Sequence, residues 1–166
     1  MSVGMINDLQ QLIGLPIHPL LVHGVVVLAP LSALAQILTV FSSRLRRRLG
    51  VITPLSALLV AVLMPITMLA GEELAKLTGP LPAVEKHAGF ATVLLPWTVA
   101  LFIASAAWWS WFRWGEEKVR HDRPGAATTV SVVIAVVLCV AAVGTVLFTV
   151  LTGDAGARAV WGGLLG

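Results

Sequence analysis

Three histidines stand beside long apolar segments, where imidazole can bind a transition-metal ion or haem iron. The stretch IHPLLVHGVVV carries His18 and His23, which are separated by Pro19. A third, His87, opens another apolar run, HAGFATVLLP. Because proline biases the residue before it toward an extended conformation, we expect His18 to lie just outside a helix that contains His23. Both imidazoles can then face one site.

Two carboxylates follow glycines at the ends of other apolar runs. Glu72 lies in TMLAGEELAKL and Asp154 lies in TVLTGDAGARA. If these residues end their helices, they meet the partial negative charge of the helix C-terminus, and a positive group should be near them. That group is either the basic residue four positions later, Lys76 or Arg158, or a bound metal cation.

Imidazole and carboxylate ligands together suit Zn(II), Fe(II) or Cu(II). Two facing histidines on different helices could instead hold haem b, and His23 with His87 is the natural pair. Nearby carboxylates can accept hydrogen bonds from the imidazole nitrogens that do not bind the metal. Methionines one helical turn apart either provide soft ligands for copper or pack in the helix interface. The predicted ligands are His18, His23, Glu72, His87 and Asp154, with the acceptors Glu73 and Glu85 and the soft ligands Met64 and Met68.

The elements that carry these residues are long apolar segments. Of the 166 residues, 58% are hydrophobic and 11% are charged, and the mean hydropathy is +0.94. This composition leaves too little polar surface for a water-soluble globule. A helix crosses a bilayer core with ~20 apolar residues while satisfying its own backbone hydrogen bonds. We therefore predict an all-α membrane protein with four transmembrane helices, at about 19–41, 51–71, 88–112 and 126–152.

The charge pattern orients these helices. Eight of the 11 basic residues lie in the connections SSRLRRRLG and RWGEEKVRHDRPG, so the positive-inside rule places both in the cytoplasm. We expect both termini and the histidines on the outer face of a bacterial cytoplasmic membrane. Residues 1–18 are predicted to form an amphipathic segment on that face, ahead of a four-helix domain at 19–166. The inner charge suits anionic lipid headgroups and not nucleic acid.

The ends of the second and fourth helices share a sequence pattern. Aligned on Gly71 and Gly153, both fit T-x-L-x-G-[E/D]-x-x-A-[K/R]. Each helix expected to begin outside also carries a histidine near its start, His23 or His87. We infer two helical hairpins related by an approximate two-fold axis along the membrane normal. The apolar cores of the helices contain no charge, which argues against an ion path through the bilayer.

The motifs IHPLLVHGVVV, GEELAKL followed by VEKHAG, and TGDAGARAVWGG together resemble a widespread bacterial family of small four-helix membrane proteins, classed among domains of unknown function. The resemblance covers essentially the whole chain. Many relatives have phenylalanine where this chain has Gly24, and histidine where it has Asp154. Some relatives are fused to Rieske iron–sulfur domains, which implies a redox partner. The family's marked positions are His18, Pro19, His23, Glu72, His87, Gly153 and Asp154.

These observations lead to one functional hypothesis and one alternative. The first is a multi-pass membrane protein that binds a transition metal or haem b at its outer face, for electron transfer or metal handling. We expect it to be a redox or metal-binding membrane subunit and not an enzyme. The alternative is a non-catalytic membrane scaffold or accessory subunit whose polar cluster binds a partner. The expected partners are the lipid bilayer, a membrane redox protein and a second copy of the chain.

Overall fold

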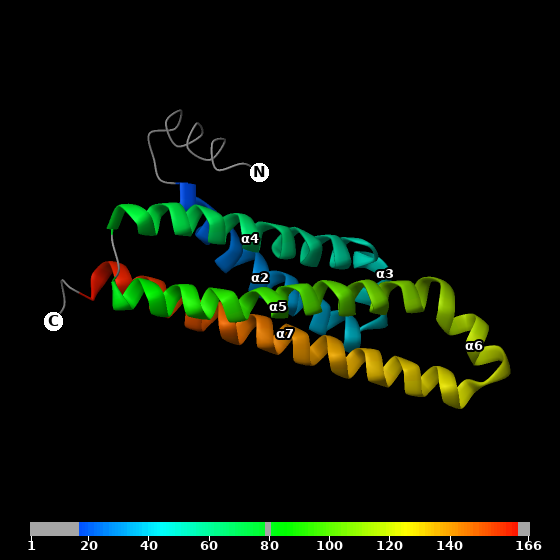
Figure 1. The fold of residues 1–166 in the computed structure, drawn as a ribbon. Helices are drawn as coiled ribbons and strands as arrows, with labels where there is room; N and C mark the ends of the chain where they lie inside the picture. Colours follow the sequence, from blue (N-terminus) through cyan, green and yellow to red (C-terminus); the bar gives the residue numbers. More distant parts are fainter. Residues whose placement is uncertain (1–16, 79–80, 163–166) are drawn as a thin grey trace.

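Four long helices make up most of the protein, and shorter elements join them (Figure 1). The computed structural model describes residues 17–78 and 81–162, and all regular elements within those ranges are helical. Four of these helices, α2, α4, α5 and α7, are long and apolar enough to cross a membrane, which confirms the predicted fold class. In chain order the elements are α2 (Ile17–Phe41), α3 (Ser43–Leu49), α4 (Ile52–Thr78), α5 (Pro82–Ser110), the π-helical turn η1 (Trp111–Gly115), α6 (Glu116–Asp122) and α7 (Pro124–Trp161).

The long helices pack as two antiparallel hairpins. Helix α2 packs against α4 and α7, and α5 also packs against α4 and α7, so α2 and α5 are diagonal to each other. The pair α2–α4 therefore lies beside the pair α5–α7 (Figure 1). Helices α3 and α6 lie at one end of the bundle, and α2 begins and α7 ends at the other.

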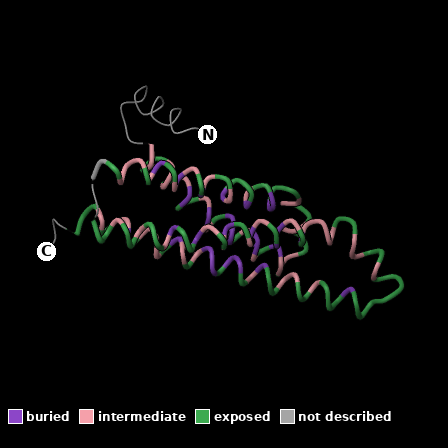
Figure 2. The backbone as a smooth tube through the Cα atoms, in the orientation of Figure 1, coloured by how far each residue is buried: buried purple, intermediate pink, exposed green. Residues whose placement is uncertain are grey.

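Buried residues lie mainly where the four helices face one another (Figure 2). Small residues dominate one cluster, where Ala33, Ala104 and Ala142 pack around Leu101 and Leu138. Apolar burial drives helix association only weakly in lipid, so close packing at small residues holds such bundles together. Many valines and leucines on the outer faces are exposed, as expected of a surface that lies against acyl chains.

Helix α2 begins earlier than predicted. It starts at Ile17, so His18 lies in its first helical turn and not outside the helix. Pro19 is compatible with this start, because the first N–H groups of a helix have no intrahelical partner to lose. The predicted amphipathic segment at 1–18 falls outside the described residues, except for its last two positions.

Helices α4 and α7 continue beyond the predicted ends. Helix α4 runs to Thr78 and α7 to Trp161, because a single glycine costs a helix interior only about 1 kcal/mol. Glu72 and Asp154 therefore lie within their helices. The predicted conflict between these carboxylates and a helix C-terminus is absent, because that effect is confined to the last turn.

Candidate functional site

His18 and His87 meet at the end of the bundle where α2 and α5 begin. Their ring centroids are 6.2 Å apart, and the ring planes are nearly perpendicular, at 84°. Because α2 and α5 are diagonal in the bundle, the two imidazoles meet across its axis. The facing pair on these two helices is therefore His18 with His87, where the sequence suggested His23 with His87.

Each ring is held by the other helix of its own hairpin. His18 Nδ1 donates a hydrogen bond to the carbonyl oxygen of Thr67 on α4, at 2.9 Å. His87 Nδ1 donates to the carbonyl oxygen of Thr152 on α7, also at 2.9 Å. A carbonyl oxygen can only accept, so Nδ1 carries the proton in both rings. In the neutral imidazole, Nε2 then keeps the lone pair that binds a metal ion or accepts a hydrogen bond.

A glycine lies against each ring. A Cβ added at Gly71 would be 2.8 Å from Cε1 of His18, and one at Gly156 would be 3.0 Å from Cε1 of His87. Each glycine stands four residues, about one helical turn, after the threonine whose carbonyl accepts from the same ring. Each imidazole therefore packs on bare helix backbone, and a methyl group at either glycine would displace it.

These equivalent contacts set the register of the internal repeat. Thr67 and Gly71 correspond to Thr152 and Gly156, so the alignment of Gly71 with Gly153 was wrong by three residues. The correct register pairs TMLAG with TGDAG, which share T-x-x-A-G. Three residues are nearly one helical turn, so a wrong alignment can still place glycines on similar faces. The two hairpins thus make equivalent contacts to their histidines, in this shifted register.

His23 lies apart from this pair. Its side chain is exposed, and its Nδ1 donates to the carbonyl oxygen of Pro19 in its own helix, at 2.6 Å. The expectation that Pro19 would interrupt the helical phase was wrong, because α2 contains both histidines. Residues five positions apart in a helix point about 140° away from each other. His23 and His18 therefore cannot face one site from a regular helix.

The carboxylates predicted as ligands lie close to basic residues of their own helices. Asp154 accepts a hydrogen bond from Nε of Arg158 at 2.9 Å, which is the local pair that the spacing predicts. Lys76 pairs with Glu73 at 2.6 Å, although the sequence suggested Glu72 as its partner. Glu72 is exposed. Such ion pairs on the protein surface contribute little to stability, so each carboxylate can leave its basic partner at little energetic cost.

The remaining predicted residues serve the fold or lie on the surface. Met64 is buried in a cluster with Val25 and Leu94, and Met68 packs against the same cluster, which matches the packing interpretation of both methionines. Glu85 is exposed. Within residues 17–78 and 81–162, no three His, Cys, Asp or Glu side chains gather closely enough to hold a metal ion. The histidine pair is thus the part of the predicted ligand set that the fold brings together.

Sequence reasoning missed the groups that position the two rings. It assigned Glu73 and Glu85 as acceptors for the imidazole nitrogens, whereas backbone carbonyls on α4 and α7 accept those hydrogen bonds. The motif T-x-x-A-G at 67–71 and 152–156 was the available signal. Both of its alanines, Ala70 and Ala155, are buried, which shows that this helix face points into the bundle.

Comparison with known proteins identified one family. A family model described as "Predicted membrane protein (DUF2231)" matches residues 14–166. Searches among curated proteins and among solved structures found no match. The matched region includes all four long helices and both rings of the histidine pair.

Proposed function

The chain belongs to the family of predicted membrane proteins DUF2231, and on this premise we propose that it binds a transition-metal ion between His18 and His87. The bound metal serves electron transfer or metal handling at the membrane. Zn(II), Fe(II) and Cu(II) all accept imidazole ligands.

The hydrogen bond at Nδ1 of each ring is the observation that carries this proposal. Histidines that bind metals almost always donate their other ring N–H to a carboxylate, a backbone carbonyl or water, which fixes the tautomer and the ring orientation. Both His18 and His87 donate in this way to carbonyl oxygens at 2.9 Å. Each ring is therefore pre-oriented with Nε2 available.

The separation of the rings also supports a shared ion. A metal–imidazole bond is about 2.0–2.1 Å long, and the ring centre lies about 1.1 Å behind the nitrogen, so each centroid stands about 3.2 Å from the ion. By the same geometry, the two centroids would be about 5.2 Å apart at a tetrahedral ion and about 6.4 Å apart on opposite sides of an ion. The observed 6.2 Å lies between these two distances. The other coordination positions are left for water, because no third His, Cys, Asp or Glu side chain of the described residues lies close enough to complete a site.

Haem b is the second form that such a centre can take. It needs two axial imidazoles on different helices, a condition that α2 and α5 meet. The porphyrin must fit between the rings, however, and each ring here packs against a glycine of the neighbouring helix. A single ion therefore requires less rearrangement than a haem.

The same hydrogen bonds also favour a non-catalytic function. They join α2 to α4 and α5 to α7, and interhelical hydrogen bonds in membrane proteins contribute about 0.6 kcal/mol each on average. In this alternative the histidines hold the hairpins together in a membrane scaffold or accessory subunit.

We further propose that the histidine pair lies on the external side of the membrane, away from the cytoplasm. The eight basic residues of the two long connections lie in or next to α3, η1 and α6, at the end opposite the histidines. The positive-inside rule then places the histidine pair on the external side of the membrane.

The test is the metal content of protein purified without chelator, measured by elemental analysis and by visible absorption. Asparagine can donate from nearly the position of Nδ1 but has no group in the position of Nε2. His18→Asn and His87→Asn therefore keep the interhelical hydrogen bond and remove the ligand. We expect both variants to fold and to lose a near-stoichiometric metal, while the matched control His23→Asn retains it.

Three outcomes decide between the proposals. A Soret band in place of a free ion would identify the centre as haem. Wild-type protein with neither metal nor haem would support the scaffold. Full metal content in both asparagine variants would contradict ligation by this pair, wherever the metal is bound.

A further inference from the structure

An apolar groove opens between α2 and α4, toward the end of the bundle opposite the histidines. The volume of the groove is about 160 Å³. Its lining includes Leu59 on α4, and it reaches Leu49 and Ile52 beside α3. The hydroxyl groups of Ser32 and Ser56 in the groove hydrogen-bond to each other at 2.9 Å. The other side chains that line the groove are mostly hydrocarbon. The part of α4 that lines the groove, residues 52–59, is about 10 Å long. The groove thus has the character and dimensions of a binding site for part of an acyl chain.

Helix α3 places unneutralised positive charge beside this groove. Its sequence, SRLRRRL, contains four arginines and no acidic residue. Arg46 turns inward, where its guanidinium lies 3.8 Å from the centre of the Phe112 ring and donates to the carbonyl oxygen of Thr39 at 3.4 Å. Burial lowers the pKa of this guanidinium. The other three arginines of α3 are exposed: Arg44, Arg47 and Arg48. They take part in none of the ion pairs found in the described ranges.

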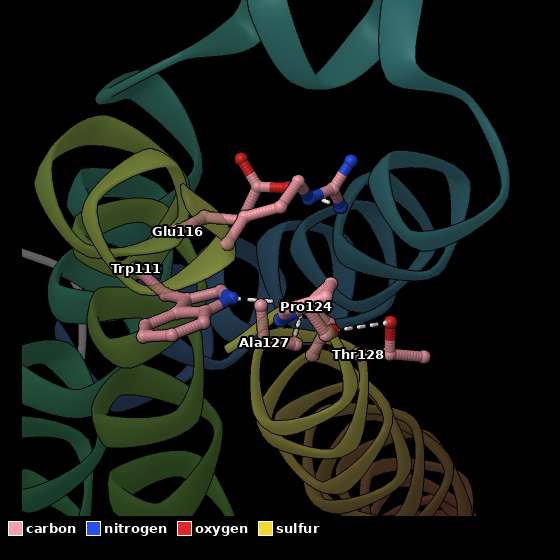
Figure 3. Close-up of polar contacts among 7 residues, drawn as sticks. Trp111, Glu116, Pro124, Ala127 and Thr128 are labelled. Carbon is pink, nitrogen blue, oxygen red and sulfur yellow. Dashed lines mark hydrogen bonds and ion pairs between the residues drawn. The ribbon is translucent and has the colours of Figure 1, made fainter. Parts of the chain in front are cut away.

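The other connection at this end is nearly neutral. From Arg113 to Arg123 the chain has four basic and three acidic residues. Glu116 forms an ion pair with Arg120. Figure 3 shows Glu116 near Trp111, whose Nε1 donates to Oγ of Ser131 at 2.9 Å. Among the described residues at this end of the bundle, the net positive charge is therefore concentrated on α3.

We propose that the α2–α4 groove binds one acyl chain of an anionic phospholipid whose phosphate is bound by the exposed arginines of α3. Basic clusters next to transmembrane helices attract anionic lipids, and the planar guanidinium group binds phosphate through two parallel hydrogen bonds. Leu49, the last residue of α3, lines the groove, so the charged and apolar parts of the site adjoin. This site lies apart from the histidine pair and does not depend on it.

The test is native mass spectrometry of the purified full chain titrated with phosphatidylglycerol or phosphatidylcholine. Wild-type protein should bind phosphatidylglycerol more tightly. Arg47→Gln/Arg48→Gln should weaken phosphatidylglycerol binding about 25-fold, or about 5-fold for each arginine. The matched control Lys118→Gln/Arg123→Gln, which removes two exposed charges from the balanced connection, should change it by less than about 2-fold.

A second variant tests the groove without altering charge. Ala35 also lines the groove, and Ala35→Phe fills it, so this variant should weaken the binding of both lipids. Equal binding of the two lipids by wild-type protein would overturn the proposal. An equal effect of the two double variants would overturn it as well. If Ala35→Phe does not fold, the comparison of the arginine variants alone decides.

Discussion

Replacing the glycines beneath the two imidazoles is the sharpest test of the site geometry. A Cβ at Gly71 would lie 2.8 Å from Cε1 of His18, and one at Gly156 would lie 3.0 Å from Cε1 of His87. Gly153 is the matched control, because it also lies within α7 and a Cβ there would meet no atom within 4 Å.

The expected magnitudes follow from three effects. Alanine in place of a helical glycine stabilises by about 0.5–1 kcal/mol, which is the whole effect expected for Gly153→Ala. At the other two sites, overpacking costs about 1–3 kcal/mol. A displaced ring also loses its hydrogen bond, worth about 0.6 kcal/mol. We therefore expect Gly71→Ala to lower the free energy of unfolding by about 0.6–3 kcal/mol, and Gly156→Ala by somewhat less.

The assay is reversible unfolding of the detergent-solubilised protein by sodium dodecyl sulfate, followed by helical circular dichroism. In the His18→Ala background the added methyl group has room, so most of the cost of Gly71→Ala should disappear in a double-mutant cycle. If Gly71→Ala stabilises the protein as much as Gly153→Ala does, the ring does not pack on this glycine. The proposed register of the repeat would then be wrong too.

Three further outcomes are expected. With Cys139 replaced by serine, Ala83→Cys should react with an impermeant thiol reagent on intact cells and Ser43→Cys should not; the reverse pattern would invert the topology. Metal retention by the histidine pair should be lost on acidification, because imidazole binds metal only when neutral, and constant retention down to about pH 4 would exclude imidazole ligands. Gly144→Ala should destabilise the protein by about 1–3 kcal/mol, because a Cβ there would overlap the indole of Trp97. Thermal unfolding measures this loss of stability, and a stabilised variant would refute the close contact between Gly144 and Trp97.

The sequence was sufficient to predict the four membrane-spanning helices and their hairpin arrangement. Hydropathy is a local property, and a bilayer of known thickness converts it directly into helix length. The two histidines that meet at the end of the bundle were also recognisable by type, because His18 and His87 were both among the predicted ligands. The boundaries of the helices were less accurate, because good helix formers carry α4 and α7 past Gly71 and Gly153.

The partnership of His18 with His87 was decided by the tertiary structure. Which of two histidines on α2 faces the bundle axis depends on the phase of the helix, and that phase depends on where α2 begins. The acceptors of the two rings are backbone carbonyls, which every residue possesses, so no residue type marks them in a sequence. Only the packing of α4 and α7 selects Thr67 and Thr152, by bringing bare backbone at a glycine within reach of each ring.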